Sequence, residues 1–266
     1  MIGVERISIC ATVVLAVFLS PALCASQTPF DGTWRIQIDQ SRFSPKPMVI
    51  FLSEGWFHCK SCNPQLNVRA DGTDQQVLGQ AYDTISVREI DPKTTHILIK
   101  KAGKVLIDET QSVSGNARML TVKTTKYPSE GGPVVTAETT AMRIGNAPAA
   151  INKTSGSWRL TRLVQSENGL LTTYKSTGEE FTMTAPTGET YTAKFNGMDF
   201  PVKGAAGYNV VALKRIDDNT FEELDKREGT VVNMARVTVS ADGKKMTIVN
   251  TNTMTDRTTT YFAVKQ

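Results

Sequence analysis

The chain has 266 residues, with 30 Lys and Arg against 26 Asp and Glu, and a formal net charge of +4 at pH 7. Acidic residues interleave with the basic ones along its length, which argues against the basic stripe that nucleic-acid binding needs. We therefore expect no nucleic-acid partner. The sequence contains two histidines, His58 and His96, which argues against a multi-histidine metalloenzyme.

Residues 1–25 are predicted to be a signal peptide. Arg6 precedes an uncharged apolar run from Ile7 to Leu19. This run has the length of a signal-peptide core and is too short to span a bilayer. We expect cleavage between Cys24 and Gln27, a secreted or periplasmic location, and no stable membrane insertion of the mature chain.

The two halves of the chain repeat each other. Gly32-Thr33-Trp34-Arg35 returns as Gly156-Ser157-Trp158-Arg159, and other shared strings keep the same order at an offset of 124 to 126 residues. Solenoid repeats have periods of about 20–50 residues, so a repeat of this length predicts a duplicated domain. We expect a first domain over 29–145, a linker over 146–155, and a second domain over 156–266. Positions that differ between the halves are where function could have diverged.

Short runs of alternating apolar and polar residues extend through both halves, and Val231–Val239 is an example. Turn signals such as Asp71-Gly72 and Asn196-Gly197 separate them, and no long helical periodicity occurs. The pattern predicts an all-β fold of two tandem antiparallel meanders, each closed into a small barrel. The alternative is one continuous β-structure in which the two halves pair edge to edge.

Phe30-Asp31-Gly32-Thr33-Trp34 at the start of a meander, with a closing strand over Thr260–Lys265, resembles the lipocalin and fatty-acid-binding (calycin) superfamily. The resemblance implies that the first-strand Trp packs across the bottom of the barrel. The equivalence of Trp34 and Trp158 likewise favours core packing. The arginine that this superfamily commonly places on the last strand has a candidate in Arg143; the second half ends in Lys265.

A second resemblance rests on Phe57-His58-Cys59-Lys60-Ser61-Cys62-Asn63-Pro64, Ala70–Gln75 and the second Gly-x-Trp string. Together these look like a group of secreted bacterial proteins that have a CxxC in the first domain and no assigned function. This resemblance implies an envelope or secreted location and no particular activity.

The pair Cys59 and Cys62 occurs only in the first half. In an oxidising compartment we expect a structural disulfide. A thiol–disulfide redox pair, assisted by Lys60 and His58, is the first alternative. A metal site is the second, although the two cysteines and His58 supply three ligands where structural zinc takes four. We predict no metal and no cofactor.

Trp56, Phe57 and His58 adjoin this pair, and the two aromatic residues have no aligned aromatic counterpart in the second half. They are candidate ligand-recognition residues on a disulfide-pinned loop. For Trp56 and Phe57, core packing is the favoured interpretation over ligand recognition.

Catalytic motifs are absent from the sequence, including the Gly-x-Ser-x-Gly elbow and His-Glu-x-x-His. The adjacent acids Glu179-Glu180 and Glu222-Glu223 should point to opposite faces of a strand, and we expect solvated edges there. We therefore predict no catalytic residues and no enzyme activity. The leading hypothesis is a binding module for a small apolar or amphipathic ligand. The alternatives are an envelope protein-interaction or structural component with filled barrels, and a thiol–disulfide protein.

Overall fold

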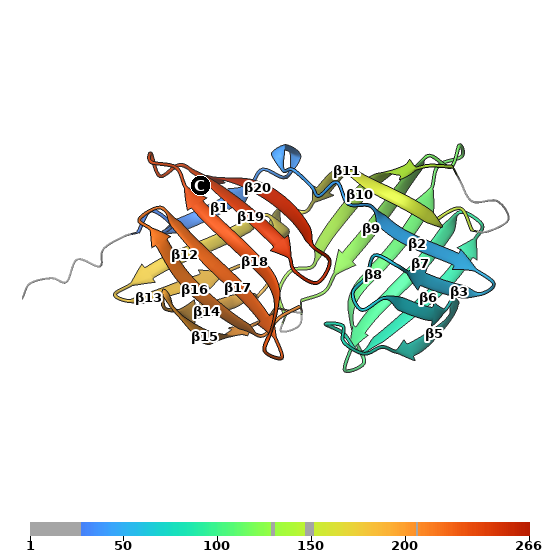
Figure 1. Ribbon diagram of the computed structural model, residues 1–266, viewed down its shortest axis with the longest axis horizontal. Helices are drawn as coiled ribbons and strands as arrows, with labels where there is room; N and C mark the ends of the chain where they lie inside the picture. The colour runs from blue at the N-terminus through green and yellow to red at the C-terminus, as the bar shows by residue number, and fades with distance from the viewer. Residues whose placement is uncertain (1–27, 129–130, 147–151, 206) are drawn as a thin grey trace, which may run out of the picture.

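The computed structural model describes residues 28–128, 131–146, 152–205 and 207–266, so the predicted signal peptide lies outside the described residues. The described residues form β-strands and two short 3-10 helices, η1 (Ile38–Gln40) and η2 (Glu167–Gly169). The strands build two antiparallel ten-stranded barrel-shaped sheets that lie side by side (Figure 1). The predicted all-β fold of two tandem barrels is confirmed. Within the described part of the chain, no helix has the length and apolar character needed to cross a membrane.

The barrel built mainly from the C-terminal half, called the second barrel, is closed by hydrogen bonds between β20 and β1. Each strand pairs with its neighbours in antiparallel fashion. In spatial order the strands are β1 (Gly32–Ile36), β12 (Leu171–Thr177), β13 (Glu180–Thr184), β14 (Thr190–Ala193), β15 (Asn196–Lys203), β16 (Val210–Asp217), β17 (Thr220–Arg227), β18 (Thr230–Val239), β19 (Lys245–Asn252) and β20 (Arg257–Lys265).

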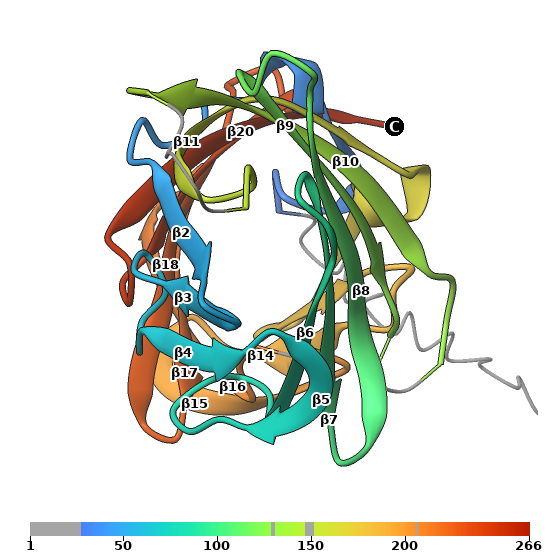
Figure 2. The same ribbon diagram turned by 90° about the vertical axis from the view of Figure 1, so that its right-hand side faces the viewer.

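The first barrel curls in the same way, as the end-on view in Figure 2 shows. Its strands run in the order β4 (Leu66–Arg69), β3 (Trp56–Cys59), β2 (Met48–Ser53), β11 (Gly156–Gln165), β10 (Val135–Ile144), β9 (Met119–Lys126), β8 (Lys104–Val113), β7 (Thr94–Lys101), β6 (Thr84–Asp91) and β5 (Asp71–Gln76). The end strands β4 and β5 are bridged by a side chain. The Gln75 amide accepts from the Arg69 N–H and donates to the Arg69 carbonyl, both at 2.8 Å.

The first strand of each half belongs to the barrel of the other half. In β1, Trp34 lies opposite Thr172 of β12 and Lys265 of β20. In β11, Trp158 lies opposite Met48 of β2 and Arg143 of β10. The chain therefore crosses between the barrels at 37–47 and again at 166–170, and β1 is seen among the C-terminal strands in Figure 1.

This exchange departs from the expected division into 29–145 and 156–266. The physical reason is the repeat itself. Because β1 and β11 are equivalent in sequence, either strand can pair with the flanking strands of either barrel and bury its apolar residues there. The choice is set by the chain connections, which the repeat does not encode.

The two repeated tryptophans are core residues in equivalent settings. Trp34 and Trp158 are each 1% exposed. Their indole Nε1 groups donate to the carbonyls of Phe30 and Thr154, at 2.7 and 2.8 Å. Asn152, Thr154 and Ser155, which lie in the expected linker, are buried against the first barrel.

Each tryptophan is covered by a cation from a neighbouring strand, β10 for Trp158 and β20 for Trp34. The guanidinium of Arg143 lies 4.0 Å from the Trp158 ring centre, and the Lys265 ammonium lies 5.4 Å from that of Trp34. Arg143 also donates to backbone carbonyls, including that of Ala117 at 2.7 Å. Burial lowers the pKa of Arg143, because desolvation disfavours its charge. Gly156 has a φ of +138°, a conformation that residues with a Cβ rarely adopt, and a Cβ there would come within 2.3 Å of the Arg143 guanidinium.

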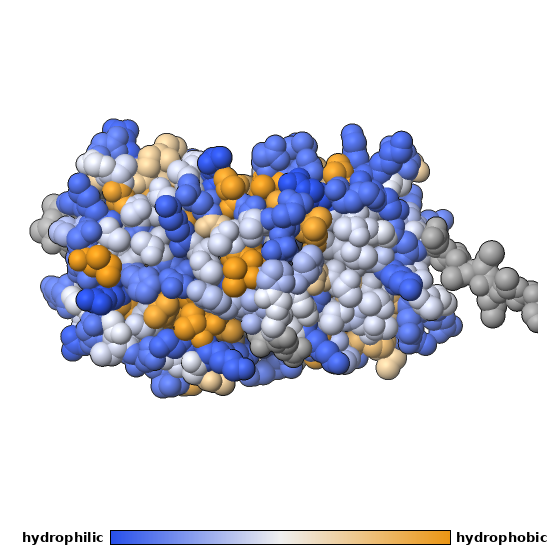
Figure 3. All heavy atoms as spheres, turned by 180° about the vertical axis from the view of Figure 1, so that it is seen from behind, coloured by the Kyte–Doolittle hydropathy of each residue, from blue (hydrophilic) through white to orange (hydrophobic). Residues whose placement is uncertain are grey.

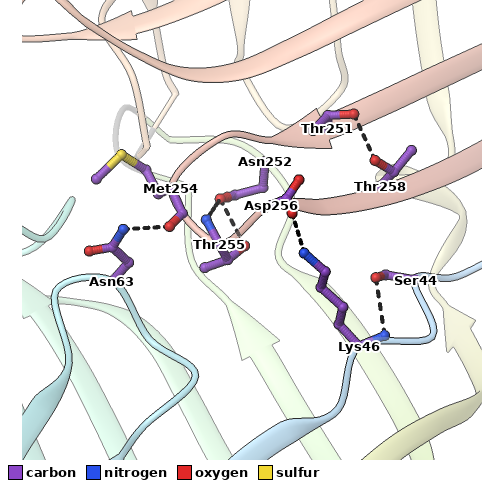
Figure 4. Close-up of polar contacts among 9 residues, drawn as sticks. All are labelled: Ser44, Lys46, Asn63, Thr251, Asn252, Met254, Thr255, Asp256 and Thr258. Atoms are coloured by element: carbon purple, nitrogen blue, oxygen red, sulfur yellow. Dashed lines mark hydrogen bonds and ion pairs between the residues drawn. The ribbon is translucent and has the colours of Figure 1, made fainter.

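Polar contacts join the two barrels at the seam. Lys46, in the first crossing segment, forms an ion pair with Asp256 in the β19–β20 turn (Figure 4). The Asn63 amide donates to the Met254 carbonyl of the same turn. Arg257 donates to the Lys46 carbonyl at 3.0 Å. The β19–β20 hairpin of the second barrel is therefore docked on the first.

Cleavage between the halves tests the exchange. A protease site introduced at 146–151 and cut in the folded protein should give two fragments that co-elute in native buffer and separate only in denaturant. Each fragment supplies a strand whose ladder hydrogen bonds and buried tryptophan complete the other barrel. Independent elution of two folded fragments in native buffer would show that the strands are not exchanged.

Substitution of the two covering cations should have unequal effects. Arg143→Met removes a close cation–π contact and hydrogen bonds from a charged donor, so we expect a loss of about 3 kcal/mol in the free energy of unfolding. Lys265→Met, at the longer distance, should cost less than about 1 kcal/mol. Urea unfolding followed by tryptophan fluorescence measures both values. Equal losses would contradict this assignment.

Candidate functional site

The two cysteines of the first half form the expected disulfide, with 5.4 Å between their Cα atoms. Cys59 is 4% exposed and belongs to the core of the first barrel. Asn63, directly after Cys62, contacts the β19–β20 turn of the second barrel. The disulfide therefore fixes a loop at the seam between the barrels.

Strand alternation separates the three candidate recognition residues beside this disulfide. Phe57 points inward and is 4% exposed in the core of the first barrel. Trp56 and His58 point outward and are half-buried. The Arg69 guanidinium covers the Trp56 ring at 4.3 Å. The structure thus places the three side chains on two faces of β3 and does not bring them together.

A cavity opens into the second barrel. It has a volume of about 410 Å³ and opens at the seam, where Lys126 and Tyr127 of the first barrel stand at its mouth. Its lining combines apolar side chains with acidic and phenolic ones. The apolar side chains include Val135 of the first barrel, Leu171 and Met183, and the acidic and phenolic ones are Tyr174, Glu189, Tyr208 and Glu223.

Acidic side chains continue along the inner face of β17. Glu223 accepts a hydrogen bond from the Tyr191 hydroxyl at 2.6 Å, and the Tyr208 hydroxyl donates to Glu189. Asp225 lies two residues beyond Glu223 on the same face of the strand and is 5% exposed. We call Glu189, Glu223 and Asp225 the acidic cluster.

Burial dominates the electrostatics of this cluster. Desolvation, with repulsion from neighbouring carboxylates, raises the pKa of Glu223 to about 7 and that of Asp225 to about 9. The pKa values of Tyr174, Tyr191 and Tyr208 are also raised, first by burial and then by the negative charge of nearby carboxylates. The carboxyl and phenol groups of the cavity wall therefore keep their protons to a higher pH than they would in water.

The acidic cluster was missed in the sequence, although the repeat contains its signal. At the offset of 126 residues, Glu223 and Asp225 correspond to Ile97 and Ile99. The structure keeps this equivalence: Glu223 lies opposite Leu213 as Ile97 lies opposite Val87. Two core positions of one barrel have thus become carboxylates in the other. The expected solvated edge holds for Glu222, which pairs with Arg236 at 3.5 Å, and is wrong for Glu223.

The first barrel holds a smaller cavity of about 300 Å³, which also opens at the seam. Its walls include Val122, Ala141 and Trp158, and Arg257 from the second barrel lies at its mouth. It has one carboxyl group, Glu109. Burial raises the pKa of Glu109.

Other polar groups have local explanations. His96 Nε2 lies 2.9 Å from Asp108 on the outer side of the first barrel. Among the described residues, no group of three or more His, Cys, Asp or Glu side chains is arranged to hold a metal ion. The face in Figure 3 carries apolar side chains in small groups separated by hydrophilic ones. The candidate ligand sites are therefore the cavities of the barrels, and not this face.

No protein-family model matches the chain, and no curated protein or solved structure is significantly similar to it.

The acidic cluster predicts a pH dependence of stability. Because the folded-state pKa values of Glu223 and Asp225 lie above those of free carboxyls, the cluster's contribution is fully present below about pH 4. It is lost as the pH rises through about 7 to 9. Calorimetry should show the Tm of the Glu223→Gln, Asp225→Asn variant rising relative to wild type between about pH 5 and pH 9. Glu222→Gln serves as the outward-facing control. A Tm difference that stays constant with pH would contradict the assignment.

Proposed function

We propose that the protein is a non-catalytic binding module for a small amphipathic ligand, held in the cavity of the second barrel. The observation that carries the proposal is the cavity of about 410 Å³, whose lining combines apolar side chains with acidic and phenolic ones. Small-molecule sites are typically concavities of about 300–1,000 Å³ in which an apolar lining is combined with a few placed polar groups. The volume and the lining of this cavity support the proposal.

The location proposed for this module is the periplasm or the extracellular space. The predicted signal peptide over residues 1–25 and the Cys59–Cys62 disulfide support it, because disulfides persist in oxidising compartments. A ligand met there would reach the cavity through its opening at the seam.

Part of the interior of the second barrel is filled by aromatic side chains, as the whole interior would be in a filled-barrel interaction component. Phe30, Phe181 and Phe221 pack edge to face there, with ring centres 4.9 to 6.1 Å apart. The seam end differs, because its inner wall is lined by carboxylates around an open volume. This asymmetry supports ligand binding over the filled-barrel alternative. The burial of Cys59 supports a structural role over thiol–disulfide exchange.

Filling the cavity tests the proposal. Nile red, a neutral apolar dye, should bind the wild-type protein saturably. Ala185→Trp, which places an indole on the cavity wall, should weaken binding there at least about tenfold. Thr192→Trp, on the exposed face of β14, is the matched control and should leave binding unchanged. Fluorescence titration measures all three proteins, and circular dichroism checks their folding. Absence of saturable binding to the wild type would overturn the proposal.

A further inference from the structure

A further cavity, called the outer cavity, lies at the end of the second barrel away from the first barrel (Figure 1). It has a volume of about 390 Å³, and its lining includes Ser176 and Phe195. Tyr174, which lines the cavity at the seam, stacks on Phe181 with 5.2 Å between ring centres. Phe195 contacts the other side of this pair, with its ring centre 4.8 Å from that of Phe181. An aromatic layer therefore lies between the outer cavity and the seam cavity.

Arg215 brings a positive charge into the outer cavity. It follows Val211 and Leu213 on the inner face of β16, and both of these residues are 0% exposed. Its guanidinium lies 4.2 Å from the ring centre of Phe195 and 5.7 Å from that of Phe30. Contact with an aromatic ring uses one face of the guanidinium and leaves the N–H groups at its edge free. The rings therefore orient Arg215 without satisfying its donors.

The guanidinium of Arg215 has no acceptor in the part of the chain that the structure describes. None of the ion pairs there includes it, and none of the hydrogen bonds there is donated by it. The carboxylate of Glu179, which also lines the cavity, pairs instead with Lys194 at 2.9 Å. Glu180 is exposed at the start of β13. A guanidinium carries five donors in a planar fork that matches an oxyanion, so its unused donors point to an anionic ligand.

Neighbouring polar groups in the lining can also donate. The hydroxyls of Thr28 and Ser176 lie 2.9 Å apart, and one of the two hydrogens is used between them. Asn196 uses its side-chain oxygen to accept from the Met198 N–H at 3.0 Å, so the amide nitrogen is the group that it can offer to a ligand. These donors lie in the same cavity as Arg215 and suit an oxyanion.

The first barrel shows that the fold does not require an arginine at this position. At the offset of 126 residues, Arg215 corresponds to Glu89, and the structure keeps this equivalence. Arg215 lies opposite Phe221 as Glu89 lies opposite Thr95. Glu89 accepts a hydrogen bond from the Asn152 amide at 2.8 Å, so its acceptor is satisfied within the chain. The second barrel has a donor at the equivalent place, and no described residue accepts from it.

The lining also limits the kind of anion. Because Lys194 is paired with Glu179, Arg215 is the one unpaired cation among the described lining residues, which favours a single negative charge. The volume exceeds what an inorganic anion fills, and Phe195 supplies an aromatic wall for an apolar body.

We infer that the outer cavity binds an aromatic monocarboxylate, whose carboxylate accepts hydrogen bonds from the Arg215 guanidinium and whose ring occupies the volume beside Phe195. This site is separate from the seam cavity and does not depend on the function proposed for that cavity.

Benzoate and benzamide test this inference, because they share one ring and differ in the charge of the head group. In ligand-observed NMR titrations at about pH 7, benzoate should bind the wild type at least about tenfold more tightly than benzamide, since hydrogen bonds to a charged acceptor are the stronger ones. Inorganic sulfate at the concentration of benzoate should not displace it. Amide shift changes at Gly178 and Asn196 should locate bound benzoate without any substitution.

Two variants assign the preference to Arg215. In Arg215→Gln, benzamide should bind as it does to the wild type, which shows that the cavity is intact, and the ratio of benzoate to benzamide affinity should fall to within about threefold of unity. Lys214→Gln removes the neighbouring cation from the exposed face of the same strand and should keep the wild-type ratio. Circular dichroism checks the folding of both variants.

The outcomes separate this inference from the proposed function. Equal binding of benzoate and benzamide to the wild type, or no binding of benzoate, would overturn the inference. A preference for benzoate that persists in Arg215→Gln would overturn the assignment to Arg215, and displacement by sulfate would overturn the class of ligand. Ala185→Trp, on the seam cavity, should leave benzoate binding unchanged, and its loss there would place the anion in the other cavity. Failure of Nile red to bind would overturn the proposed function alone.

Discussion

The exchange of β1 and β11 is the constraint on which the rest of the structure depends. Each strand pairs on both sides within the other half's barrel and buries a tryptophan there. Removing either half would break two ladders and expose a core. The barrels therefore act as one folding unit, and the segments that cross between them lie where the two barrels meet.

That geometry explains where the cavities open. The chain must cross the seam twice, at 37–47 and 166–170, and residues of the second crossing line the mouth of the second-barrel cavity. The disulfide loop and the β19–β20 hairpin meet at the same seam (Figure 4). The two barrels share this architecture and differ in the polar side chains that point into their interiors. The duplication kept the scaffold and changed the chemistry of the interiors.

Much of this could be predicted from the sequence. Strand alternation and turn residues gave the all-β class, and the repeated Gly-x-Trp marked two equivalent cores around Trp34 and Trp158. The exchange could not be predicted, because equivalent strands fit either barrel. The inward position of Glu223 was missed because an adjacent acidic pair looks like a solvated edge. The available signal was the repeat, in which Glu223 and Asp225 occupy the positions that Ile97 and Ile99 have in the first half.

The most direct test of the account is disulfide cross-linking of β1 in the full chain. Arg35 lies opposite Val264 in the exchanged arrangement. In the unexchanged one it would take the place of Arg159, opposite Met142. If β1 is exchanged, peptide mapping should find an intrachain disulfide in the Arg35→Cys, Val264→Cys variant and none between the introduced cysteines of the Arg35→Cys, Met142→Cys variant. A cross-link in the second pair alone would contradict the exchange and the seam built on it.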